Sequence, residues 1–222
     1  DIPPWVEANG LTSKIRLNTQ DVFNTYNGKS FFNEETLGSL HTALIKTNWV
    51  KEVLLEKSFP SKIQMTVAFR KPLVSFLDKS YWYSLDSEGF LVPVVEPQGA
   101  EKLDVVRFID VPSSLVPLKP GELIGIDSAK RALLLSILIS ERVTSPGKLL
   151  KIIFIKDTEE KGYRFKLIFQ NGLEVLWGTF LIKDEIERFP GKYLTSEEKL
   201  GVFFGILNKN PNQLHINLEF LK

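Results

Sequence analysis

Residues 48–73 read NWVKEVLLEKSFPSKIQMTVAFRKPL, and this stretch decides the fold of the N-terminal part of the chain. Residues 49–56 predict a β-strand and residues 59–61 a turn. From Ile63 to Arg70, apolar and polar residues then alternate, which is the pattern of a strand with one buried face. Pro72 has no backbone N–H, so we expect this second strand to end there or to lie along a sheet edge.

Upstream of this stretch, the sequence predicts three further elements. Consecutive prolines near the start indicate that residues 1–11 are extended, because proline disrupts helices and sheet pairing. Alternation predicts a short strand over residues 14–17. Asn33, followed by two glutamates and an apolar face, predicts the N-cap of a helix from Glu34 to about Lys46.

The remaining two thirds of the chain predict a group of strands with two helices. The predicted strands are 81–85, 90–95, 105–109, 149–156, 163–170, 173–177 and 214–221. The predicted helices run from Asp127 or Ser128 to Arg142, and from a capping box at Thr195–Glu198 to about Leu207. Asn171-Gly172 predicts a hairpin and orders the strands on either side of it as antiparallel. The fold class is therefore α+β, with a larger second domain of antiparallel or mixed sheet and flanking helices.

The composition argues against several classes of function. The 222 residues include 28 Lys and Arg against 27 Asp and Glu, a net charge of +1, so no overall field favours a nucleic-acid partner. The absence of cysteine excludes disulfides, thiolate nucleophiles and sulfur-bound metals. No stretch approaches the roughly 20 apolar residues that span a bilayer. The first residues also lack the pattern of a signal peptide.

No catalytic or metal-binding motif stands out. His41 and His215 are isolated in the sequence, without a second ligand at metal spacing, so we predict no metal site. No glycine-rich loop has the strand-loop-helix setting that binds phosphate, and we predict no cofactor. The acidic clusters lie beside Lys or Arg, which is typical of solvated surfaces. We therefore expect a protein that is not an enzyme; an active site assembled from dispersed carboxylates is the alternative from another class.

Several ordered stretches resemble the FtsQ/DivIB family of bacterial cell-division proteins. Residues 48–73 resemble its POTRA signature: Trp and a hydrophobic residue ending a helix, a strand, a proline-containing turn, a second strand, and a charged residue before proline. Residues 81–90, YWYSLDSEGF, are similar to its aromatic-x-x-Asp-x-x-Gly hairpin. Residues 169–175, with Gly178, resemble the hairpin of its β domain. The resemblance covers about residues 12–222.

This resemblance implies a fold and a cellular role. It implies a POTRA-like domain over residues 12–76, with helices packed on a three-stranded sheet, and a β domain over 77–222. It also implies a non-enzymatic divisome scaffold that binds FtsB-like and FtsL-like bitopic proteins, with other division proteins at the POTRA domain. A preceding transmembrane helix would anchor it in the bacterial inner membrane, with this chain on the extracytoplasmic side. The alternative is a POTRA module of outer-membrane protein assembly or secretion.

The last predicted strand is the candidate binding site. A partner strand gains main-chain hydrogen bonds by adding to an open sheet edge. We expect Leu214, Ile216, Leu218 and Phe220 to face the core. The candidate partner-binding residues are His215, Ile216, Asn217, Leu218, Glu219, Phe220 and Leu221, together with Gly178 and Thr179. A strand that only completes the sheet is the other interpretation.

This closing strand departs from the family pattern. The family usually reads apolar-Asp-Leu-Arg-Tyr, whereas this chain has Ile216-Asn217-Leu218-Glu219-Phe220, so one charge is lost and one is reversed. Residues 180–194 look like an insertion.

Overall fold

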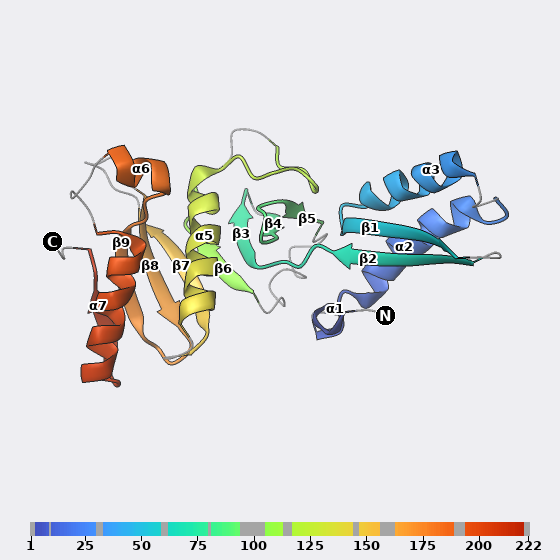
Figure 1. Ribbon diagram of the computed structural model, residues 1–222. Helices are drawn as coiled ribbons and strands as arrows, with labels where there is room; N and C mark the ends of the chain where they lie inside the picture. Colours follow the sequence, from blue (N-terminus) through green and yellow to red (C-terminus); the bar gives the residue numbers. More distant parts are fainter. Residues whose placement is uncertain are drawn as a thin grey trace.

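The computed structural model describes residues 3–8, 10–29, 33–58, 62–79, 81–93, 105–112, 117–143, 147–155, 163–188 and 194–219. The fold is α+β, as predicted: helices and a two-stranded sheet come first, and an eight-stranded mixed sheet follows. Figure 1 shows the two parts end to end in an elongated molecule. We call the described residues up to Phe69 the N-terminal unit and those from Val74 onward the C-terminal unit.

Three helices begin the N-terminal unit: α1 (Pro4–Ala8), α2 (Thr12–Tyr26) and α3 (Glu34–Ile45). The prediction of an extended segment over 1–11 is wrong, because Pro4–Ala8 form helix α1. Pro4 is the first residue of this helix, a position that accommodates proline well. The strand predicted over 14–17 is also wrong. The buried or half-buried Leu11, Ile15, Val22 and Tyr26 recur at helical spacing, and this longer period outweighs four alternating residues.

The third helix follows its prediction closely. The Asn33 side chain accepts a hydrogen bond of 2.9 Å from the Glu35 N–H, which is the predicted N-cap. Leu40 and Leu44 of α3 are buried against Val50 and Val53 of the first strand. This cluster is the core of the N-terminal unit.

The sheet of the N-terminal unit consists of β1 (Val50–Ser58) and β2 (Lys62–Phe69), paired antiparallel. The alternation predicted for β2 is confirmed: Met65 and Val67 are half-buried, whereas Thr66 and Ala68 are exposed. The turn predicted at 59–61 lies outside the described residues. Three strands were expected, but the sheet has two among the described residues, because residues 14–17 are helical.

The chain crosses to the second sheet at residues 70–73, where Pro72 prevents β2 from continuing. Strand β3 (Val74–Asp78) pairs with β4 (Tyr81–Leu85), and β4 pairs with β5 (Leu91–Val92). The domain boundary predicted between residues 76 and 77 therefore falls inside β3, a strand of the large sheet.

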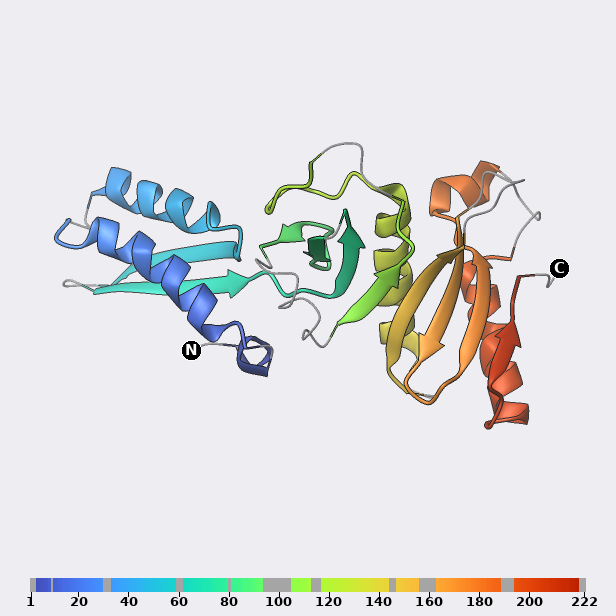
Figure 2. The same cartoon turned by 180° about the vertical axis from the view of Figure 1, so that it is seen from behind.

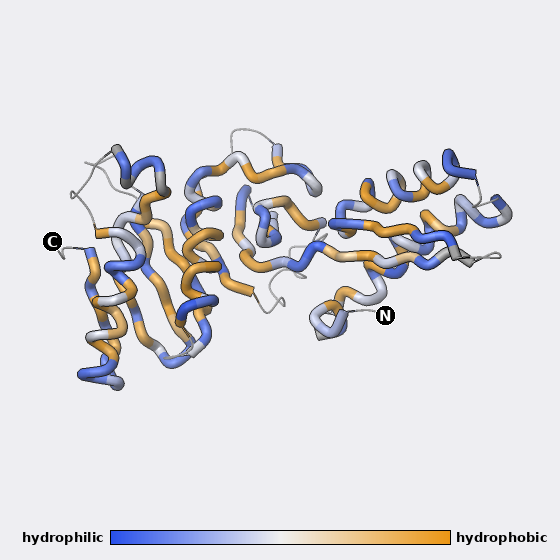
Figure 3. Tube along the Cα trace, viewed as in Figure 1, coloured by the Kyte–Doolittle hydropathy of each residue, from blue (hydrophilic) through white to orange (hydrophobic). Residues whose placement is uncertain are grey.

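The large sheet has the strand order β10-β9-β8-β7-β6-β3-β4-β5 among the described residues. Its remaining strands are β6 (Val106–Ile109), β7 (Leu149–Ile155), β8 (Arg164–Phe169), β9 (Glu174–Thr179) and β10 (His215–Asn217). The hairpin predicted at Asn171-Gly172 is confirmed, because β8 and β9 are antiparallel neighbours, and β7 extends it to an antiparallel meander. The pairs β3–β6, β6–β7 and β9–β10 are parallel. Figure 3 shows hydrophobic residues concentrated along the central strands.

Two helices cover one face of this sheet. Helix α5 (Asp127–Arg142) connects the parallel strands β6 and β7, and α7 (Ser196–Lys209) connects β9 and β10. Both lie in front of the strands in Figure 1 and behind them in Figure 2. The capping box predicted at Thr195 and Glu198 is confirmed. Helix α5 begins at Asp127 with Ile126 as its N-cap, so neither Asp127 nor Ser128, the two residues expected from the sequence to cap it, does so.

Helix α6 (Lys183–Arg188) lies within the segment interpreted as an insertion and is fastened to α5. Arg131 of α5 is buried and donates to both carboxylate oxygens of Glu185, at 2.6 and 2.7 Å, and to the Phe180 carbonyl. One carboxylate of the acidic cluster at 184–187, interpreted from sequence as solvated, therefore holds two helices together.

A small core joins the two units. Trp49 is fully buried together with Val6, Ile15 and Val92, so residues of α1, α2 and β5 meet around it. A Trp that ends a helix before a strand is expected from the sequence to be a core residue, and this expectation is confirmed for Trp49. Because these side chains come from both units, separating the units would expose them to water.

Candidate functional site: the sheet edge at β10

Strand β10 is the outermost strand of the large sheet. It follows α7 and the turn at 210–212, and it pairs in parallel with β9, with His215, Ile216 and Asn217 opposite Glu174, Val175 and Leu176. In the described part of the chain, no strand lies on its other side. The predicted strand 214–221 is much longer than the three residues that pair, and Phe220 and Leu221 lie outside the described residues.

The backbone of β10 points its hydrogen-bonding groups in alternating directions. The Leu214 carbonyl accepts from the Glu174 N–H, and the Leu218 N–H donates to the Leu176 carbonyl, both at 2.8 Å. These bonds turn residues 214, 216 and 218 toward β9. In a parallel ladder the residues between them face away, so the N–H groups of His215 and Asn217 point out from the sheet edge.

Two side chains partly cover this edge. Gln213 donates from Nε2 to the His215 carbonyl at 2.7 Å. The Asn217 Oδ1 atom accepts from the Glu219 N–H at 2.9 Å. The edge is therefore short and partly capped by side chains, and its outward groups include the N–H of residues 215 and 217.

The side chains of the last strand divide largely as predicted. Ile216 and Leu218 are buried in the main core, whereas His215 and Asn217 are exposed. Leu214, expected to face the core, is instead 55% exposed, because it lies in the approach to the strand rather than within it.

Gly178 lies against Glu219, so the two parts of the predicted site meet. The pairing of β8 with β9 shifts register beside Phe165, and Gly178 has φ +72°, a conformation typical of a glycine bulge. A Cβ atom at Gly178 would lie 3.0 Å from the Glu219 Cα. Thr179, the last residue of β9, is half-buried opposite Arg164. The glycine is needed because the backbone of residue 219 passes directly over it.

Lys199 of α7 holds this bulge from the core side. Its Nζ atom donates to the carbonyls of Trp177 and Thr179, both at 2.7 Å, and it lies 5.7 Å from the centre of the Trp177 ring. Burial lowers the pKa of Lys199 to about 8, and the negative charge of Glu219 partly opposes that shift. Lys199 was not among the residues predicted from the sequence. Its spacing of four residues before the buried Phe203 was the available signal.

Charged residues on β8 and β9 contact one another and residues 215 and 219 of the last segment. Arg164 forms an ion pair with Glu219. Glu219 stands where the FtsQ/DivIB pattern has an arginine, so the reversed charge has a partner of opposite sign in this chain. Lys166 lies 2.7 Å from Glu174, and this hydrogen bond is the main reason that the pKa of Glu174 is lowered. His215 Nδ1 lies 3.4 Å from the same carboxylate. Sequence reasoning did not find Arg164, because its partner is 55 residues away.

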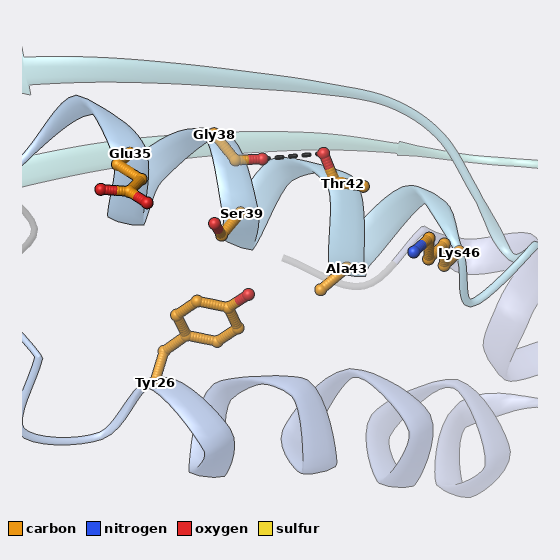
Figure 4. A pocket seen from close by; sticks show the side chains of 7 residues that line it. All are labelled: Tyr26, Glu35, Gly38, Ser39, Thr42, Ala43 and Lys46. Carbon is orange, nitrogen blue, oxygen red and sulfur yellow. Dashed lines mark hydrogen bonds between the residues drawn. The ribbon is translucent and has the colours of Figure 1, made fainter.

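A separate groove of about 560 Å³ lies between α2 and α3 in the N-terminal unit. Figure 4 shows the Tyr26 ring pointing from α2 toward α3, and Thr42 donating to the Gly38 carbonyl at 2.9 Å. Its charged lining residues are Glu35 and Lys46, which are about 16 Å apart along the helix axis. This lining brings no acid and base together.

Within the described ranges, no group of three or more His, Cys, Asp or Glu side chains is arranged to hold a metal ion. Among the described helices, none combines the length with the apolar composition that a membrane span requires. A comparison with known protein families found no matching family, and a comparison with curated proteins found no match.

Proposed function

We propose that this chain is a non-enzymatic scaffold of the bacterial cell-division complex, of the FtsQ/DivIB type, which recruits FtsB-like and FtsL-like proteins by strand addition at β10. In this proposal it works on the extracytoplasmic side of the inner membrane, anchored by a transmembrane helix that precedes Asp1. Other division proteins would bind its N-terminal unit, the POTRA-like domain of the proposal.

The ordered resemblance over residues 48–73 and 81–90 is the sequence support for this proposal. In the structure, the first stretch forms β1, β2 and the crossing to the large sheet, and the second forms the β4–β5 hairpin. Two helices packed on one face of a small sheet also agree with a POTRA-like domain. The two-stranded sheet is a departure from the three strands that the resemblance implies.

The observation that carries the proposal is the position of β10 at the end of the large sheet, with the N–H groups of His215 and Asn217 directed outward. A partner strand beside β10 would accept from these groups and gain main-chain hydrogen bonds. Buried Ile216 and Leu218 anchor the strand to the core, so the edge is already in place before a partner arrives. This saves the entropy cost of ordering it on binding.

The test is a titration of the chain with soluble segments of the FtsB-like and FtsL-like proteins from the same genome, using two variants of one residue. Asn217→Pro removes an outward N–H but leaves the bonds of residues 216 and 218 to β9. Asn217→Thr changes the same side chain and keeps the N–H, so it is the matched control. Both variants should unfold in urea near the wild-type midpoint.

We expect saturable binding to the wild type and to Asn217→Thr, and at least about tenfold weaker binding to Asn217→Pro. Equal binding to both variants would move the site away from β10. An absence of binding to the folded wild type would overturn the assignment of these partners.

A further inference from the structure

Four strands of the described chain lie at a sheet edge: β1 and β2 in the small sheet, and β5 and β10 in the large one. An edge strand offers unpaired backbone groups to any other strand, so proteins usually protect it with a covering segment, charges, bulges or proline. Each of the four can be compared on these criteria.

Two of these edges, β5 and β1, are protected, and β10 is the edge to which the proposed function already assigns a partner. Residues 121–124 cover β5, where Leu91 donates to the Glu122 carbonyl at 2.9 Å and accepts from the Gly121 N–H at 2.7 Å. The short β10 is capped only in part, because the side chains of Gln213 and Asn217 bond the His215 carbonyl and the Glu219 N–H and leave the outward N–H groups of residues 215 and 217 available. Strand β1 has a register shift between Val50 and Glu52, and its charged residues are Lys51, Glu52, Glu56 and Lys57.

Over its last six residues, strand β2 has none of these protections among the residues that the structure describes. Residues 64–69 contain no charge and no proline, and their register with β1 is regular as far as Ala68. The Arg70 N–H donates to the Trp49 carbonyl at 2.8 Å, so residue 70 faces β1. Because directions alternate along a strand, the N–H groups of Met65 and Val67 point outward, and those of Thr66 and Ala68 point toward β1.

The space beside β2 suits a strand that carries no helix of its own. Figures 1 and 2 both show α2 crossing β2 obliquely and continuing past its outer edge, on the face where α3 also lies. A third strand beside β2 would lie beneath this part of α2. The β2 strand of a second copy would bring its own α2 to the same face, so an extended segment of another protein fits better.

We propose that the outer edge of β2 binds an extended segment of a partner protein, at a surface separate from β10; this names a surface for the partner binding proposed above for the N-terminal unit, and it rests on that part of the proposed function. The bound segment has apolar residues at alternate positions, which extend the row of Met65 and Val67 under α2. Its middle is uncharged, because residues 64–69 offer no charge to pair with. A carboxylate at one end complements Lys71, which is exposed just after β2.

The test uses the isotope-labelled full chain and a synthetic probe, a peptide of about nine residues with alternating Val and Thr and a terminal Glu. A second peptide of the same sequence carries N-methyl groups on alternate residues and cannot complete a ladder. The measurement is amide hydrogen exchange. Bound probe should slow the exchange of Met65 and Val67 by at least about tenfold, whereas Thr66 and Ala68, already bonded to β1, should change little.

Thr66→Lys places a charge on the exposed face of β2 and should weaken probe binding by at least about tenfold. Leu54→Lys on β1, directly opposite Thr66, is the matched control and should bind the probe like the wild type. Protection only at residues 215 and 217, equal protection by the N-methylated peptide, or no protection would each overturn the proposal. Protection of Met65 and Val67 that rises with protein concentration in the absence of probe would identify a second copy as the occupant instead.

Discussion

Arg70 donates a hydrogen bond of 2.6 Å to Asp86, and this ion pair joins the end of β2 to the turn between β4 and β5. The other oxygen of the buried Asp86 carboxylate accepts from the N–H groups of Glu88 and Phe90, both at 2.9 Å. The Arg70 guanidinium also lies 4.2 Å from the centre of the Phe90 ring. One carboxylate therefore shapes a turn and fastens the two units together.

We predict that Asp86→Ala lowers the free energy of unfolding by about 3 kcal/mol, because it leaves Arg70 and two backbone N–H groups without their partner. Asp86→Asn keeps an acceptor for the turn and should lose less. Urea denaturation measures both. A loss for Asp86→Ala no larger than that for Asp86→Asn would show that the turn bonds contribute little.

Trp49→Ala should destabilise both units at once, because its fully buried side chain packs with residues of each. We expect a loss of about 3–5 kcal/mol in the free energy of unfolding. The check is urea denaturation followed by hydrogen exchange of amides in β2 and in β8. If the amides in β8 keep their wild-type exchange while those in β2 accelerate, the two units unfold independently.

The buried ammonium of Lys199 predicts an unusual pH dependence. Its pKa is about 8 in the folded chain, against the ordinary lysine value of 10.5 in the unfolded chain, so the unfolded chain binds more protons between pH 8 and pH 10.5. The free energy of unfolding should therefore rise as pH increases from 8 to 10.5, by up to about 3 kcal/mol from this group.

Lys199→Met is the comparison for this pH effect, since it keeps an apolar side chain of similar length and removes the titrating group. Burial raises the pKa of Tyr163, which acts in the opposite direction at high pH, but this contribution is present in both proteins and cancels in the difference. If the difference in free energy of unfolding between the two proteins stays constant from about pH 7.5 to about pH 10.5, the range over which Lys199 loses its proton, the prediction is contradicted.

Gly178→Ala should be more damaging than Gly172→Ala, although both glycines have positive φ. At Gly172 nothing lies within 4 Å of the added Cβ atom, so only the backbone conformation is penalised, by about 1 kcal/mol. At Gly178 the Cβ atom meets the Glu219 backbone, and we expect a total loss of about 2–4 kcal/mol. Equal losses in thermal or urea denaturation would mean that residues 217–219 shift without cost.

Local signals in the sequence were reliable where a few adjacent residues supply both partners of an interaction. The Asn33 cap, the capping box of Thr195 and Glu198, and the Asn171-Gly172 turn are all formed as predicted. In each case the bonded atoms lie within a few residues of one another, so the sequence contains the whole interaction.

Local patterns failed where two periods compete within a short stretch. Residues 14–17 alternate as a strand would, yet they belong to a helix of 15 residues whose buried side chains follow the longer period. Because these residues are helical, the small sheet has two strands in the described part of the chain and not the expected three. Which period prevails depends on the surface against which the residues pack, and four residues do not specify that surface.

The sequence by itself determined the α+β class, most of the strands and the alternation that buries Ile216 beneath α7. Only the tertiary structure decided that β10 pairs in parallel at the end of the sheet, that Lys199 holds the bulge beside Gly178, and that Arg164 pairs with Glu219. Secondary structure follows from periodicity and caps over a few residues. The pairing of β10 with β9, the bonds of Lys199 and the Arg164–Glu219 pair all join residues 20 or more positions apart, so they exist only once the chain has closed around a core.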